Sequence, residues 1–202
     1  MKGKLFTIEG IDGSGKTTVT EKIYQELKEE TNKEIIKTTE PSTTWLGEAV
    51  KKGLNREIDP IAEAFLFTSD HIEHVSKKIK PNLAEGKVVI SDRYSDSFYA
   101  YQGVTIKDNV KNPIQYLIKL RDRFTIKPDT VFLLDLEPEE AFERLGENKI
   151  KFEKIDFLEK VRKNYKKLSK KEERDYITID ASRSIKKVKK DVLEEIKERI
   201  NF

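Results

Sequence analysis

An eight-residue stretch near the start of the chain, GIDGSGKT, has residue types and a spacing that suit phosphate binding. Gly13 and Gly15 let backbone N–H groups converge on a phosphate without a clash from a Cβ atom. Lys16 can reach the outer phosphates of a nucleotide, and the hydroxyl of Thr17 can bind Mg²⁺. The residues that we expect to contact the phosphates are Gly10, Ile11, Asp12, Gly13, Ser14, Gly15, Lys16, Thr17 and Thr18.

The residues around this stretch decide between two interpretations of it. The plainer alternative is a glycine-rich turn without a ligand, but the stretch follows an apolar run and opens a helical pattern, which favours a phosphate-binding loop. A second apolar run, VVISDRY, places Asp92 at the end of a buried strand, where its carboxylate can bind Mg²⁺ directly or through water. We therefore expect a nucleoside triphosphate, with Mg²⁺ held by Thr17 and Asp92.

Short apolar runs alternate with longer helical patterns along the whole chain. The runs VVI and VFLL are continuous, as in strands that are covered on both faces. This alternation predicts an α/β fold in which helices cover a parallel sheet, as one domain over residues 1–202. We expect Pro81 to kink or end the helix that precedes it. The predicted strands are Lys4–Glu9, Glu34–Thr39, Lys87–Ser91, Thr130–Leu136 and Tyr176–Asp180.

The composition argues against several classes of protein. Charged residues make up 38% of the chain, but the net charge is only +3, so we expect no nucleic-acid partner. Cysteine is absent, which excludes disulfides and thiolate metal sites. No apolar run is long enough for a signal peptide or a membrane span, so we expect a cytoplasmic protein without a membrane partner. His71 and His74 could form a metal pair, but without a third ligand we interpret them as ordinary polar helix positions.

Six stretches of the chain resemble the thymidylate kinase family in order and spacing. They are FTIEGIDGSGKTT, TEPS, LFTSDH, SDRYSDSFYAYQG, KPDTVFLLDL and IDASRS, and the resemblance extends from about Leu5 to Val188, nearly the whole chain. The resemblance implies a P-loop three-layer sandwich with a five-stranded parallel sheet, flanking helices and a short lid at about residues 146–154. It further implies transfer of the γ-phosphate of ATP to dTMP, with Mg²⁺, by a homodimer that packs through helices.

The resemblance also implies a set of acceptor-site residues. Asp12 would face the acceptor near the sugar, and Arg93 would clamp the dTMP phosphate, since a guanidinium can bind phosphate bidentately. Phe67 would stack on thymine, and the bulk of Tyr101 would exclude a ribose 2′-hydroxyl. The residues themselves also allow a salt bridge of Arg93 to Asp12 or Asp92, and a core position for Phe67. Pro41 resembles a family proline that follows a cis peptide bond.

On the donor side, the resemblance assigns Arg144 to stacking on adenine. An exposed helix charge is the alternative for this residue. The turn DASRS, which contains Ala181 and Ser182, resembles the loop that borders the adenine. A strand-to-helix connection in which Ser182 or Ser184 caps the helix is compatible with the same residues.

Several departures from the family pattern bear on the acceptor and on turnover. Thr39 and His71 stand where the family has arginines, and we expect His71 at the substrate site. The lid contains lysines but no arginine, so we expect Lys151 to supply the stabilising cation. Phe152 replaces the usual tyrosine of the lid at the substrate. Two further functions therefore remain open: a nucleoside-monophosphate kinase that also accepts dUMP or UMP, and a nucleotide-binding protein with little transfer activity.

Overall fold

The computed structural model describes residues 3–146, 154–170 and 174–200, and all five predicted strands occur in it. They form one parallel sheet in the order β2-β3-β1-β4-β5. Three of the five strands differ from the prediction by one residue at one or both ends, because pairing with neighbouring strands, and not hydrophobicity alone, decides where a strand ends. The strands are β1 Lys4–Glu9, β2 Ile35–Thr39, β3 Val88–Asp92, β4 Thr130–Asp135 and β5 Tyr176–Asp180.

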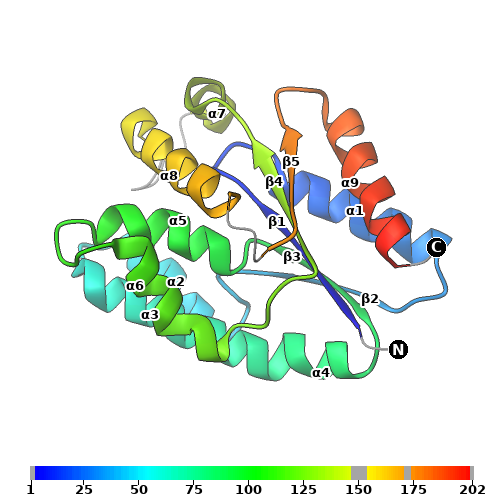
Figure 1. Cartoon of the computed structure of the whole chain (residues 1–202), viewed down its shortest axis with the longest axis horizontal. Helices are drawn as coiled ribbons and strands as arrows, with labels where there is room; N and C mark the ends of the chain where they lie inside the picture. Colours follow the sequence, from blue (N-terminus) through cyan, green and yellow to red (C-terminus); the bar gives the residue numbers. More distant parts are fainter. Residues whose placement is uncertain (1–2, 147–153, 171–173, 201–202) are drawn as a thin grey trace.

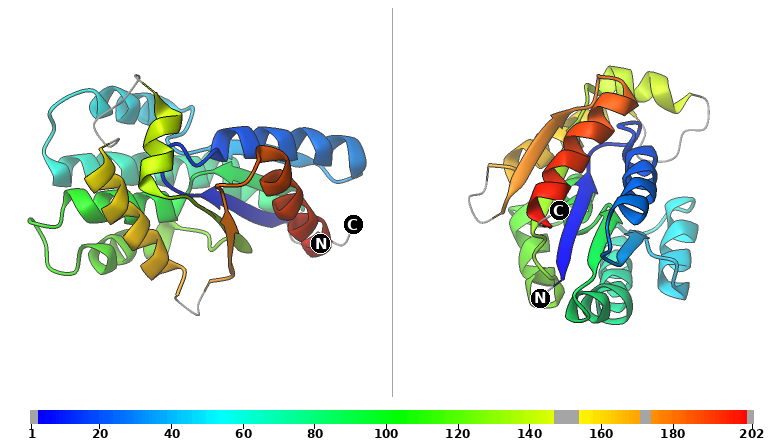
Figure 2. Two further views of the ribbon diagram at one scale, coloured as in Figure 1. Left: turned by 90° about the horizontal axis from the view of Figure 1, so that it is seen from above. Right: turned by 90° about the vertical axis from the view of Figure 1, so that its right-hand side faces the viewer.

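Helices cover both faces of the sheet, which gives the predicted three layers. The helices α1 and α9 lie side by side on one face, while α3, α5 and α8 lie on the other (Figures 1 and 2). The helical segments are α1 Lys16–Glu30, α2 Trp45–Leu54, α3 Pro60–His74, the π-helix η1 Val75–Ile79, α4 Lys80–Ala84, α5 Ser95–Thr105, α6 Pro113–Arg121, the 3₁₀-helix η2 Asp122–Phe124, α7 Pro138–Leu145, α8 Ile155–Leu168 and α9 Ile185–Arg199.

The continuous apolar runs lie at the centre of the sheet, as their sequence predicts. Phe6 and Ile8 of β1, Ile90 of β3 and Phe132 of β4 are fully buried between the two helical layers. Removing this apolar surface from water supplies the main driving force for the fold. None of the described helices is long and apolar enough to cross a membrane.

The helix around Pro81 continues where we expected a kink or an end. The irregularity lies before the proline, because η1 forms a π-helical turn between α3 and α4, and Pro81 occupies the first turn of α4. In a regular α-helix the proline ring would clash with the carbonyl of Lys77, four residues earlier. A wider turn at this position lets the chain continue without that clash.

The carboxyl ends of β1, β2 and β3 meet at one edge of the sheet. In the sheet register Asp92 lies next to Ile8 on one side and next to Thr39 on the other. The loops that follow these three strands are therefore neighbours in space, although they lie far apart in the sequence. Ligands of open parallel sheets bind at such an edge.

Candidate active site

The loop between β1 and α1 has the backbone that a phosphate-binding loop requires. Gly10 and Gly13 have φ values of 144° and 83°, which residues with a Cβ atom rarely adopt. A Cβ on Gly13 would also lie 2.4 Å from the carbonyl oxygen of Ala141. The first residue of α1 is Lys16, so the positive end of the helix points toward this loop.

Lys16 is buried and lies folded against the loop. Its Nζ donates to the carbonyl oxygen of Ile11 at 2.7 Å and lies 3.5 Å from the hydroxyl of Ser14. Burial, together with the charge of Arg93, lowers the pKa of Lys16 to about 8. A cation in a site that water does not screen attracts phosphate more strongly than an exposed one.

Thr17 and Asp92, the two predicted metal ligands, lie together. The Thr17 hydroxyl donates to Oδ2 of Asp92 at 2.6 Å, and Oδ1 of Asp92 is buried without a hydrogen-bond partner among the described residues. Such an oxygen suits a hard cation. The described residues contain no cluster of three or more His, Cys, Asp or Glu side chains, so an ion here would need phosphate oxygens and water as further ligands.

A cavity of about 150 Å³ lies beside the loop, and five predicted acceptor residues line it. Phe67 and Tyr101 give it aromatic walls, and Phe98 packs against Phe67 with 6.4 Å between ring centroids. The Glu40–Pro41 peptide bond is cis, as the family resemblance implies. The predicted residues in its wall are Asp12, Pro41, Phe67, Arg93 and Tyr101.

Asp12 joins the loop to this cavity through two side chains. It forms an ion pair with Arg93, and the Tyr101 hydroxyl donates to Oδ2 of Asp12 at 2.8 Å. The hydroxyl also accepts a hydrogen bond from the backbone N–H of Asp12 at 2.9 Å. Burial alone would raise the pKa of Asp12, but the charges of Arg93 and Lys16 lower it. The predicted salt bridge of Arg93 therefore exists, and it holds the guanidinium at the cavity.

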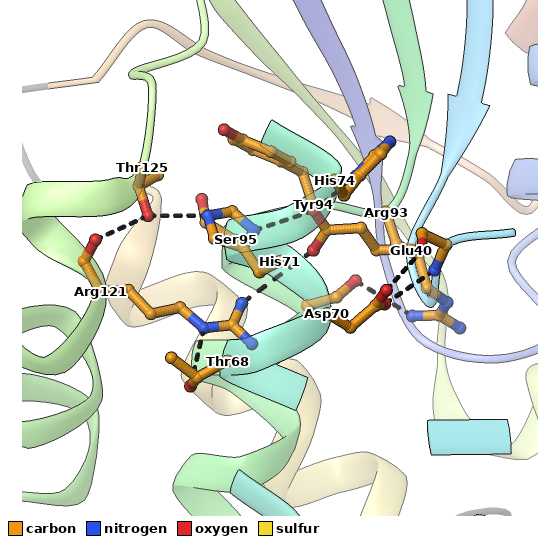
Figure 3. Close-up of polar contacts among 12 residues, drawn as sticks. Glu40, Thr68, Asp70, His71, His74, Arg93, Tyr94, Ser95, Arg121 and Thr125 are labelled. Carbon is orange, nitrogen blue, oxygen red and sulfur yellow. Dashed lines mark hydrogen bonds and ion pairs between the residues drawn. The ribbon is translucent and has the colours of Figure 1, made fainter. Parts of the chain in front are cut away.

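His71 and His74 are buried, unlike the ordinary polar positions that we expected. Figure 3 shows both rings at the carboxylate of Glu40, where their Nδ1 atoms lie 2.8 and 3.0 Å from Oε1. The second nitrogen of His71 contacts Thr125, so both ring nitrogens of His71 are engaged. Burial alone would raise the pKa of Glu40, but the two histidines lower it. Burial lowers the pKa of His71.

This cluster also changes the assignment of His71. Its side chain does not line the acceptor cavity, whereas Glu40 does. Arg121 reaches the same carboxylate from α6, with Nη1 4.0 Å from Oε2 of Glu40, and its guanidinium stacks 3.3 Å above the ring of Phe98. The cluster therefore contacts Glu40 and Phe98, which both line the cavity.

The predicted donor-side residues also come together. Nη2 of Arg144 donates to the carbonyl oxygen of Ala181 at 3.1 Å and pairs with Glu140. Ser182 bonds to Asp180 within its own turn. Ser184 is the N-cap residue of α9 but makes no side-chain cap hydrogen bond. This loop and α7 lie beyond the phosphate-binding loop, at the carboxyl edge of the sheet (Figure 1).

Comparison with known proteins agrees with this geometry. The family model described as thymidylate kinase matches residues 8–192. The chain belongs to the thymidylate kinase family. It is 49% identical to a probable thymidylate kinase of Methanosarcina mazei, over 99% of this chain and 98% of the relative. It is 46% identical to one of Methanococcoides burtonii, over 97% of both chains.

Several site residues of this thymidylate kinase family member escaped the sequence interpretation. Glu40 and Gln102 line the cavity, and both lie within stretches that we had matched to the family, TEPS and SDRYSDSFYAYQG. Arg121 gave no signal, because a single arginine in a helical pattern is usually exposed. Lys151 and Phe152 lie outside the described residues, and the lid assignment stays a prediction.

Proposed function

We propose that this protein is a thymidylate kinase, which transfers the γ-phosphate of ATP to dTMP and releases dTDP and ADP. The observation that carries this proposal is the Asp12–Arg93 pair, which lies between the phosphate-binding loop and an aromatic cavity. A phosphate donor on one side and a phosphate acceptor on the other would meet at this pair. Phosphoryl transfer depends mainly on positioning and on charge stabilisation, and this arrangement supplies both.

On the donor side, the loop amides and Lys16 would hold the outer phosphates of ATP, and Arg144 with the turn at Ala181 and Ser182 would border the adenine. Thr17 and the unpaired oxygen of Asp92 fit Mg²⁺. When bound, the ion would neutralise charge that develops on the phosphates. On binding ATP, the Lys16 ammonium would give up its hydrogen bond to the carbonyl oxygen of Ile11 and bind the phosphates instead. The negative charge of the phosphates would then compensate for the burial of this cation.

On the acceptor side, Phe67 would stack on the base, and Arg93 would bind the phosphate. Gln102 lines the same cavity, and its amide nitrogen is buried without a hydrogen-bond partner among the described residues. This nitrogen can donate to a carbonyl oxygen of the base. The Tyr101 ring, fixed by its two hydrogen bonds to Asp12, would crowd the 2′ position of a ribose.

Relaxed acceptor choice remains the second candidate. It is favoured by His71, because neither ring nitrogen of His71 is free to replace the donor that an arginine would bring. A nucleotide-binding protein without activity is disfavoured, since Asp12, Lys16 and Arg93 are all present and lie together.

We also propose that the protein is a homodimer. Trp45 on α2 and Phe65 on α3 are 73% and 47% exposed, and Tyr116 on α6 is 37% exposed. These three helices lie on the same side of the sheet (Figure 1). Large aromatic side chains are enriched at protein–protein contacts, which supports packing through this face.

The proposed reaction is tested by measuring ADP formation from ATP and Mg²⁺ with and without dTMP. A kinase produces ADP only when the acceptor is present. Equal ADP formation without dTMP would identify an ATPase. No ADP above the blank, in protein that binds ATP, would identify a nucleotide-binding protein without transfer activity.

A further inference from the structure

The backbone of Arg93 adopts a conformation that residues other than glycine rarely adopt. Its φ is 65°, in the left-handed region, which is unfavourable for a residue with a Cβ. Three hydrogen bonds hold this turn. The Arg93 N–H donates to the carbonyl oxygen of Ile8 at 3.0 Å, and the Ser91 hydroxyl donates to the carbonyl oxygen of Arg93 at 2.6 Å. The N–H of Tyr94 donates to Oε1 of Glu9 at 2.9 Å.

The second carboxylate oxygen of Glu9 reaches the side chain of the same arginine through one hydroxyl. Ser97 donates to Oε2 of Glu9 at 2.5 Å, and Nη1 of Arg93 donates to the Ser97 oxygen at 3.1 Å. Nη1 also lies 3.4 Å from the carbonyl oxygen of Gly10, while Nη2 pairs with Asp12. One carboxyl group is therefore linked to both ends of Arg93: directly to the backbone N–H of the next residue, and through Ser97 to the guanidinium.

A glutamate is unfavourable at this buried position unless its carboxyl group has a specific role. It is fully buried at the end of the central strand, and burial, with the charge of Asp96, raises its pKa to about 8. Buried ionisable groups are weak contributors to stability, and apolar replacements are often at least as stable. The alternative is a brace within the core that has no part in the reaction. A purely structural role would not require one oxygen to bind the N–H that follows Arg93 and the other to reach its guanidinium through Ser97.

We propose that Glu9 is a positioning residue for Arg93: one of its oxygens holds the left-handed turn, and the other holds the guanidinium through the Ser97 hydroxyl. The proposal rests on the role of Arg93 as the clamp of the acceptor phosphate, proposed above. Left-handed residues at functional sites persist where their surroundings fix them, and Glu9 supplies part of this fixation. A clamp that is aligned before the acceptor arrives loses less side-chain freedom when it binds.

The first test removes both oxygens at nearly constant volume with Glu9→Met. The KM for dTMP should rise by about tenfold or more, while the KM for ATP should change by less than about twofold. Glu9→Gln keeps an acceptor for the Tyr94 N–H and a polar group for Ser97, so it should restore the KM for dTMP to within about threefold of wild type. Thermal unfolding of each variant reports whether the fold is intact.

Tyr165→Phe is the matched control for the loss of a hydrogen bond in this buried cluster. The Tyr165 hydroxyl contacts Ser97 at 2.8 Å and Glu9 at 3.2 Å, and among the described residues no hydrogen bond joins it to Arg93. Its loss should leave the KM for dTMP within about twofold of wild type. A rise in this KM as large as that of Glu9→Met would overturn the proposal, because any damage to the cluster would then suffice.

The decisive comparison repeats Glu9→Met in an Arg93→Met background. If Glu9 acts through Arg93, the second substitution has no further effect on the KM for dTMP, whereas equal fold-changes in both backgrounds overturn the proposal. If Arg93→Met alone leaves dTMP kinetics unchanged, the clamp role itself fails, and the positioning role fails with it. Should Glu9→Met not fold, Ser97→Ala removes the side-chain arm alone, and an unchanged KM for dTMP in that folded variant overturns the proposal.

Discussion

The ammonium group of Lys16 is buried beside Arg93, and its pKa of about 8 leads to a pH prediction. Only the protonated amine attracts phosphate, so kcat/KM for ATP should fall as the pH rises through about 8. Lys16→Ala should lower kcat and kcat/KM together, because it removes an interaction that strengthens in the transition state. Lys22→Ala, at an exposed position of the same helix, is the control. Full activity of Lys16→Ala would make the loop a structural turn.

Asp92 leads to a prediction about metal dependence. Its unpaired oxygen and the Thr17 hydroxyl fit Mg²⁺, so Asp92→Ala should weaken the response to the ion rather than abolish turnover. Titration of the rate with Mg²⁺ should show a higher midpoint and partial recovery of activity at excess metal. A midpoint equal to that of the wild type would remove Asp92 from the metal site.

At the level of elements, the segment between α7 and α8, which the family resemblance predicts to be a lid, leads to the least obvious prediction. Members of the family usually have an arginine in this segment or in the phosphate-binding loop, whereas this chain has only lysines there. An arginine finger contributes about 10³–10⁵ in rate, and a lysine lacks its bidentate fork, so Lys151→Ala should lower kcat by at least about tenfold with little change in dTMP affinity. Lys149→Ala should have a smaller effect. Near wild-type turnover of both variants and of the double variant would show that the stabilising cation lies elsewhere. Arg144 and Arg93 would then be the next candidates.

The strands and the loop could be predicted because their signals are local. Continuous apolar runs and a fixed glycine–lysine spacing can be recognised without knowing what packs against them. The Glu40 cluster could not be found in this way, since His71 lies 31 residues from its partner and joins it only when α3 packs beside β2. The left-handed turn of Arg93 gave no signal either, because the stretch SDRYS contains no glycine. Contacts between distant segments hold that turn.

At the scale of the whole molecule, the exposed aromatic residues predict the oligomeric state. A negative charge in an apolar contact between subunits is costly, so Phe65→Glu should convert a dimer to a monomer, measured by light scattering after size-exclusion chromatography. Phe124→Glu is the matched control, since Phe124 is 48% exposed but lies in η2, outside α2, α3 and α6. A wild-type monomer, or a dimer that survives Phe65→Glu, would contradict packing through this face.

In the proposed function, the cavity of Phe67, Arg93 and Tyr101 selects dTMP as the acceptor. The most direct test is internal competition, in which dTMP, dUMP and UMP at equal concentration share one reaction with ATP and Mg²⁺. The ratio of the diphosphates formed early gives the ratio of kcat/KM. The thymine methyl contributes on the order of 1–3 kcal/mol, so dTDP should exceed dUDP by about 10- to 200-fold, and UDP should be lower still because Tyr101 crowds the 2′-hydroxyl. Equal amounts of the three diphosphates would contradict selection of dTMP by this cavity.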